Sequence, residues 1–89
     1  MKKYTFIFEY KRGTYIKQIS APSLKDSILI WGSLINSSEI PGFDDLKQKQ
    51  LIKQIQNETA CLLDGMENVW CLFPRVGYSS HLLNIVATL

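Results

Sequence analysis

Apolar and polar side chains alternate along the first ten residues of the chain. Tyr4, Phe6, Phe8 and Tyr10 fall on one side of an extended backbone, and Thr5, Ile7 and Glu9 fall on the other. A repeat of two residues is typical of a β-strand, so we predict a strand over residues 4–10. The run from Thr14 to Ile19 is rich in β-branched and aromatic residues and predicts a second strand.

The segment Lys11-Arg12-Gly13 separates these two strands and predicts a hairpin. Gly13 suits the left-handed position that closes a three-residue loop, which places Tyr10 opposite Thr14 and Phe8 opposite Ile16. A two-residue loop is disfavoured because Arg12 would need a positive φ. With this register, the side of the second strand that carries Tyr15 and Ile19 faces away from the Tyr4 to Tyr10 row.

A helix is predicted to begin after Ser23, which together with Asp26 resembles a capping box. Leu24, Ile28, Trp31 and Ile35 recur at helical steps and form one apolar stripe. Gly32 lies inside this helix and weakens it by up to ~1 kcal/mol relative to Ala, unless close packing requires a residue without a side chain.

A second helix is predicted over residues 46–56, preceded by Asp44 and Asp45, whose negative charge favours a helix N-terminus. Two endings are open. The helical spacing continues through Leu62, which favours a longer helix terminated by Gly65, whereas residues 59–63 before Asp64-Gly65 equally suit the start of a hairpin. We favour the longer helix.

Two β-prone segments follow, over residues 68–73 and 81–88, and residues 74–80 between them supply a loop with Pro and Gly. The element order is therefore strand, strand, helix, helix, strand, strand. It predicts one α+β domain over residues 1–89: a two-layer sandwich with a four-stranded antiparallel sheet (ββααββ) and both helices on one face. Apolar side chains are expected on the uncovered face, namely Ile7, Tyr15, Ile19, and Trp70 and Leu72 if their side of the strand points outward.

The apolar fraction of the chain is 46% in 89 residues. A chain this short cannot bury all of its apolar side chains by itself, so we expect a partner to cover some of them, either a second copy in a homodimer or another protein. No apolar run approaches the ~18 residues that are needed to cross a bilayer. The formal net charge of +2 is too small to indicate a class of binding partner. We expect no membrane association, a cytosolic location, and free thiols at Cys61 and Cys71.

The candidate chemistry is sparse. A hairpin through residues 74–80 brings Cys71 and His81 onto one sheet face, and a Cys-His pair can activate a thiolate. A cysteine between Val69 and Phe73 is more typical of a small buried hydrophobic residue, so we expect no enzyme and no cofactor. One His and two Cys fall short of the four ligands of a structural zinc site, so no metal site is predicted.

Nucleic-acid binding is the alternative function. Five basic residues decorate the aromatic-rich first hairpin, and sheets with exposed aromatic rings stack bases. The aromatic row is better explained as the face covered by the helices, which makes this reading the weaker one. The basic residues are Lys2, Lys3, Lys11, Arg12 and Lys17.

Arg75 and Tyr78 lie in the loop between the last two strands. Both residue types are favoured at the centres of protein interfaces, so this loop is a candidate contact element. No motif in the chain identifies a family. The sequence alone predicts a protein-interaction or accessory module that acts through an apolar sheet face, an exposed strand edge or a dimer interface.

Overall fold

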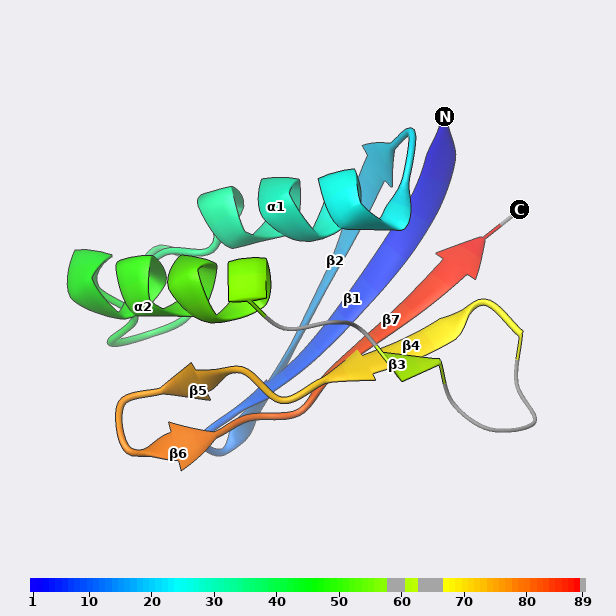
Figure 1. The fold of residues 1–89 in the computed structure, drawn as a ribbon. Coiled ribbons are helices and arrows are strands. Elements are labelled where there is room, and N and C mark those ends of the chain that lie inside the picture. Colours follow the sequence, from blue (N-terminus) through cyan, green and yellow to red (C-terminus); the bar gives the residue numbers. More distant parts are fainter. Residues whose placement is uncertain (58–60, 63–66, 89) are drawn as a thin grey trace.

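A computed structural model describes residues 1–57, 61–62 and 67–88 of the chain (Figure 1). Seven strands and two helices lie in these residues. In chain order they are β1 (Lys2–Tyr10), β2 (Gly13–Ala21), α1 (Leu24–Leu34), α2 (Asp45–Asn57), β3 (Cys61–Leu62), β4 (Val69–Leu72), β5 (Arg75–Val76), β6 (Ser79–Ser80) and β7 (Leu83–Thr88).

The main sheet is antiparallel throughout, with the strand order β2-β1-β7-β4-β3. Its four longer strands and the two helices confirm the predicted α+β fold with the order ββααββ. The helices lie together on one face of the sheet, as Figure 1 shows. α1 contacts β2 and β1, whereas α2 contacts α1 and β5. Strands β5 and β6 form a separate two-stranded ribbon.

The core lies between the helices and the aromatic row of β1. Tyr4, Phe6, Phe8 and Tyr10 are all buried, as the alternating pattern predicts. Trp31 of α1 is the largest side chain in this core: it stacks on Phe6 at 5.3 Å between ring centroids and meets Phe8 edge-on at 5.2 Å. Such aromatic pairs contribute about 0.5–1.5 kcal/mol each beyond the burial of their area.

The predicted register of the first hairpin is wrong by one residue. Tyr10 pairs with Gly13 and Phe8 with Tyr15, so the loop contains two residues, Lys11 and Arg12. Lys11, rather than Arg12, takes the positive φ, at 53°. A hairpin turn of type II′ needs a positive φ only at its first central residue, which removes the objection to a two-residue loop.

A shift of one residue moves every side chain of a strand to the other face. Tyr15 and Ile19 therefore face the helices, on the same side as Phe8 and Tyr4, and the prediction that they lie on the uncovered face is wrong. The composition of β2 explains the outcome. Ile19 and Ala21 bury completely or nearly so, whereas the intervening positions on the other face carry Gln18 and Ser20, which gain from water.

The predicted start of α1 is confirmed. Ser23 is the N-cap, and its side-chain oxygen accepts a hydrogen bond from the backbone N–H of Asp26 at 3.2 Å. The Ser23 hydroxyl in turn donates to the Asp26 carboxylate at 3.0 Å. The cap satisfies one N–H group that has no partner within the helix, which typically stabilises a protein by ~1 kcal/mol.

The longer second helix is wrong. α2 ends at Asn57, and Cys61–Leu62 is a short strand that pairs with Cys71 and Trp70 of β4. The backbone groups of β4 that point away from β7 would otherwise have no partner in the sheet, and this pairing supplies one. Gly65, the predicted terminator, lies outside the described residues.

The predicted loop at residues 74–80 contains the β5–β6 ribbon, which is attached to α2 by side chains. The backbone N–H of Arg75 donates to the Gln54 side-chain oxygen at 3.2 Å, and that of Gly77 donates to the Gln50 oxygen at 2.8 Å. Val76 is buried beneath this contact. The ribbon therefore closes the end of the core under α2.

Close packing explains the glycine inside α1. A Cβ atom on Gly32 would lie 2.5 Å from Cδ1 of Ile55 in α2, far inside van der Waals contact. Absence of a side chain lets the two helices approach, so the propensity cost at this position is offset by interhelical packing.

We predict that Gly32→Val destabilises the protein by about 2–3 kcal/mol, because the added methyl groups overfill the α1–α2 contact. The measurement is urea unfolding followed by circular dichroism. Ser33→Val is the matched control: it places the same β-branched residue at the next, exposed position, where only a few tenths of a kcal/mol are expected. Equal losses in the two variants would contradict the packing explanation.

The hairpin turn generates a second prediction. Lys11→Gly should stabilise the protein by about 0.5–1 kcal/mol, since glycine adopts a positive φ without the steric cost that lysine bears. Arg12→Gly should be neutral or destabilising, because Arg12 has no positive φ to relieve. Thermal unfolding of both variants distinguishes the two residues; a higher melting temperature for Arg12→Gly alone would refute the assignment of the turn.

Candidate strand-docking edge

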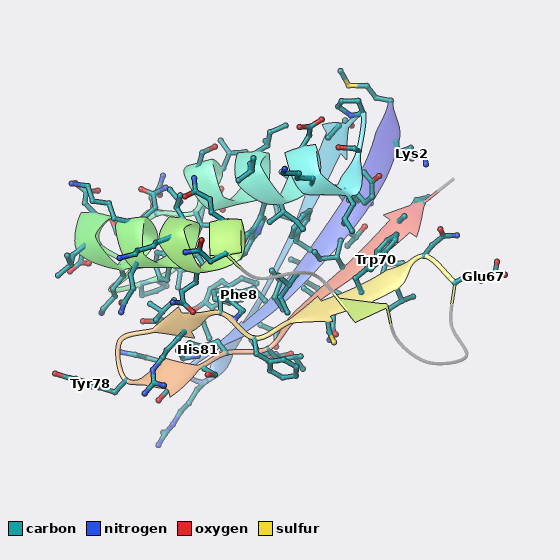
Figure 2. The ribbon with its side chains drawn as sticks, in the orientation of Figure 1. Lys2, Phe8, Glu67, Trp70, Tyr78 and His81 are labelled. Atoms are coloured by element: carbon teal, nitrogen blue, oxygen red, sulfur yellow. The ribbon has the colours of Figure 1, made fainter. Side chains whose placement is uncertain are left out.

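The Cys71–His81 pair that was considered as candidate chemistry is not formed. Cys71 alternates with the buried Leu72 and therefore lies on the uncovered face of β4. His81 packs on the helix-covered side, with its ring 4.6 Å from that of Tyr10 and 6.2 Å from that of Phe8 (Figure 2). Its Nε2 lies 3.3 Å from the carbonyl oxygen of Val76. The sheet separates the thiol from the imidazole.

Cys71 carries a free thiol, as predicted. The side chain of Cys61 lies outside what the structure describes. Among the described residues, no group of three or more His, Cys, Asp or Glu side chains is placed to hold a metal ion.

The basic residues of the nucleic-acid alternative do not surround an exposed aromatic platform. Lys2 and Lys3 lie at the start of β1, and Lys11 and Arg12 lie at the hairpin turn, about 25–30 Å away along a nine-residue strand. The aromatic side chains of β1 between them are buried. Lys17 forms an ion pair with Glu39 on the helix-covered side.

The uncovered face of the sheet is less apolar than predicted. Ile7 lies on it, as expected, opposite Ile16 of β2. Trp70 and Leu72 do not: Leu72 is buried, and Trp70 lies on the same side, 6.4 Å from the ring of Tyr4. They face the helices because the sheet register places them opposite the buried residues Ile85 and Leu83 of β7.

Polar side chains interrupt the apolar ones on this face. Its apolar members, spread over four strands, are Ile7, Ile16, Val69, Cys71 and Val86. Thr5, Gln18 and Asn84 lie among them in the same register. The face as a whole is therefore no continuous hydrophobic patch.

Arg75 and Tyr78 belong to the β5–β6 ribbon rather than to the main sheet. Both are exposed, and Tyr78 is 98% exposed at the turn between the two short strands (Figure 2). Their role as contact residues stays a prediction.

The most distinctive surface of the molecule is the edge of β2. This strand contains nine residues and ends the sheet on one side, and no other strand in the described part of the chain pairs with its outer edge. Tyr10 and Gly13 close a two-residue loop and therefore form a hydrogen-bonded pair, and such pairs alternate along antiparallel strands. The N–H and C=O groups of Thr14, Ile16, Gln18 and Ser20 consequently point away from β1.

The other edge of β1 supports this assignment. The N–H of Glu9 donates to the carbonyl oxygen of Leu82 at 2.9 Å, so the odd-numbered residues of β1 bond toward β7 and the even-numbered ones toward β2. None of the turn, loop and cap hydrogen bonds among the described residues involves the outward backbone groups of β2. Eight backbone groups, four donors and four acceptors, thus form a row available to an added strand.

Natural proteins usually guard such an edge with charged side chains, proline or a bulge. The four outward positions of β2 are uncharged and include no proline. Lys17 is the charged residue in the middle of the strand, but it points to the helix side, where its ammonium group donates to the Glu39 carboxylate. The ion pair holds the positive charge away from the row of free backbone groups.

A recess of about 340 Å³ lies beside this edge. Residues 14–17 of β2 form one wall, Trp31 of α1 and the C-cap residue Ile35 form another, and Glu39 lies at the end. A strand added to β2 would direct alternate side chains toward the helix layer, and the recess lies on that side. The free strand edge and the recess therefore lie next to each other.

Comparisons with known proteins give no further guidance: no family model, curated protein or solved structure matches the chain. Within the described residues, neither helix is long and apolar enough to span a lipid bilayer.

Amide exchange tests the orientation of the β2 edge. In a dilute sample shown by sedimentation to be monomeric, we predict that the N–H groups of Ile16 and Gln18 exchange with deuterium about 10- to 100-fold faster than those of Tyr15 and Lys17, which bond to β1. Ile7, in the sheet interior, is the slow internal reference. The measurement is a series of NMR spectra after transfer to heavy water; equal protection of all four β2 amides would contradict the register.

Proposed function

We propose that the protein is a protein-interaction module that accepts an extended segment of its partner as an additional strand along β2. The observation that carries the proposal is the row of outward backbone groups at four uncharged positions of the nine-residue β2 edge, beside a recess. In strand addition, main-chain hydrogen bonds provide most of the affinity, and pockets for alternate side chains provide specificity.

The two faces of the added strand would meet different surroundings. Side chains on the uncovered face would lie beside Ile16, which is 66% exposed. Side chains on the helix-covered face would enter the recess, where the Lys17–Glu39 pair offers a hydrogen-bonding group of either charge, since Trp31 and Ile35 are buried behind it. This arrangement favours a partner strand with apolar side chains on the uncovered face and small or polar ones on the helix-covered face.

The proposal is for an accessory role without catalysis, in the cytosol, where cysteine thiols stay reduced. Nucleic-acid binding has less support, because the aromatic side chains that would stack on bases are buried.

A synthetic strand tests the proposal without knowledge of the natural partner. The probe is a nine-residue peptide of alternating Thr and Val with a terminal Lys at each end, titrated into isotope-labelled protein. We expect saturable NMR shifts of the Thr14, Ile16, Gln18 and Ser20 amides, with a Kd in the range of about 0.1–1 mM that is typical of weak, largely main-chain recognition.

Two controls make the result specific. Ile16→Pro removes one outward N–H and leaves the β1–β2 ladder intact, since that N–H points away from β1; it should weaken binding at least fivefold. A peptide with N-methyl groups at alternate residues should not bind. Shifts confined to α2 or to the β5–β6 ribbon, or binding by the N-methylated peptide, would refute docking at the edge.

A further inference from the structure

Apolar side chains flank the β2 edge on the helix side of the sheet. Ile30 and Leu34 of α1 are 39% and 42% exposed. Each is two residues from Gly32, so each lies about 200° around the helix from the position that packs against α2. Because α1 lies over β2 and β1, the flank turned away from α2 is the flank on the side of the β2 edge.

Another apolar side chain flanks the same edge on the uncovered face. Ile16 is 66% exposed and lies directly opposite Ile7 of β1. The row of free backbone groups is therefore bordered by apolar residues on both faces of the sheet: Ile30 and Leu34 on the helix side, and Ile16 on the uncovered side. A protein interface along this edge would bury these three side chains.

We infer that the strand that docks on β2 is β2 of a second copy of this chain, paired antiparallel about a two-fold axis at Ile16; this inference rests on the proposed function and names its partner. The outward backbone groups restrict the register, because only even-numbered residues of the two copies can face each other and exchange hydrogen bonds. Three central registers satisfy this condition.

Side-chain pairing selects among the three. An axis at Lys17 leaves the exposed Ile16 opposite the polar Gln18 of the second copy. An axis at Gln18 leaves Ile16 opposite Ser20 of the second copy and Lys17 opposite Ile19. An axis at Ile16 pairs the two exposed Ile16 side chains with each other and Thr14 with Gln18, and of the three registers it is the one in which Ile16 meets another apolar side chain.

The chosen register joins the apolar residues of both copies. On the uncovered face, Ile7 and Ile16 of one copy continue into Ile16 and Ile7 of the other, as one row across the seam. A two-fold axis perpendicular to the sheet keeps both helix layers on the same side, so Ile30 and Leu34 of the two copies approach each other above the seam. Roughly six backbone hydrogen bonds link the strands.

Contacts between the two α1 helices increase the area that the dimer interface buries. Stable interfaces bury roughly 1,200–2,000 Å² in total, more than a single pair of strand edges supplies. The α1 flanks add apolar area where the charge of Lys17 has already been neutralised by Glu39. The dimer is therefore a sheet interface reinforced by helix contacts.

Sedimentation equilibrium over a range of micromolar concentrations tests the dimer. Wild type should approach twice the monomer mass of 10.2 kDa. Ile16→Lys, which places two ammonium groups at the axis, should raise the dissociation constant about tenfold or more. The matched control is Leu46→Lys: Leu46 is 75% exposed in α2, so the same change of charge and size there should leave the dissociation constant unchanged.

Cross-linking tests the register. In a background with Cys61→Ser and Cys71→Ser, Ile16→Cys should oxidise readily to a covalent dimer because the two copies of residue 16 are opposed. Gln18→Cys should oxidise at least tenfold more slowly, since the two copies of residue 18 lie about 13 Å apart along the strands. Circular dichroism establishes that each variant is folded before it is compared.

The outcomes separate the two proposals. A monomer at all concentrations that binds the Thr/Val peptide at the β2 edge overturns the homodimer and leaves the proposed function standing. A monomer that binds no peptide overturns both. A dimer that Ile16→Lys does not weaken, or that cross-links faster through residue 18, uses another surface or register and overturns the inference.

Discussion

The pairing of Tyr10 with Gly13 is the constraint on which the arrangement of this molecule depends. It fixes a two-residue turn, and the turn fixes which half of β2 faces the helices. Ile19 and Ala21 enter the core as a result, and the more polar half of the strand faces solvent. The same pairing decides which backbone groups of β2 bond to β1 and which point outward. The two-residue turn thus determines both which side chains of β2 enter the core and which of its backbone groups are free at the sheet edge.

The aromatic core gives this geometry its stability. Trp31 meets both Phe6 and Phe8 at centroid distances near 5 Å, so α1 is held over the first hairpin. Gly32, one residue further on, brings α2 against α1. Adjacent residues of a helix point in directions about 100° apart. One turn of α1 therefore packs on the sheet, contacts α2 and leaves a third side exposed.

Much of the fold could be predicted from spacing alone, because the long alternating run at Tyr4–Tyr10 and the apolar stripe of α1 repeat over several turns or residue pairs. The hairpin register could not be derived so simply. It depends on one dihedral angle at Lys11, and a positive φ at lysine is unfavourable in isolation. The cost is outweighed by burial of Ile19 and Ala21, a long-range effect. The alternating composition of β2 contained the signal, since its polar and apolar positions separate except at Ile16 and Lys17.

The end of the second helix was missed for a related reason. Helical spacing continues past Asn57, but Cys61–Leu62 pairs with β4, and the partner lies several residues further along the chain. Of the interaction candidates, Ile7, Arg75 and Tyr78 were placed correctly at the surface or on the uncovered face, and Tyr15, Ile19, Trp70 and Leu72 were not. Each error follows from register, which local sequence specifies weakly.

The two edge strands of the main sheet differ in their described length: β2 contains nine residues, and the described part of β3, at the opposite edge, contains two. An assembly that grows by joining sheet edges needs two compatible edges on every subunit, as amyloid fibrils do. Pairing of two β2 edges about a two-fold axis, as proposed, would use the long edge of each copy. Self-association of this kind stops at the dimer. An unpaired edge strand is then covered without the growth of a filament.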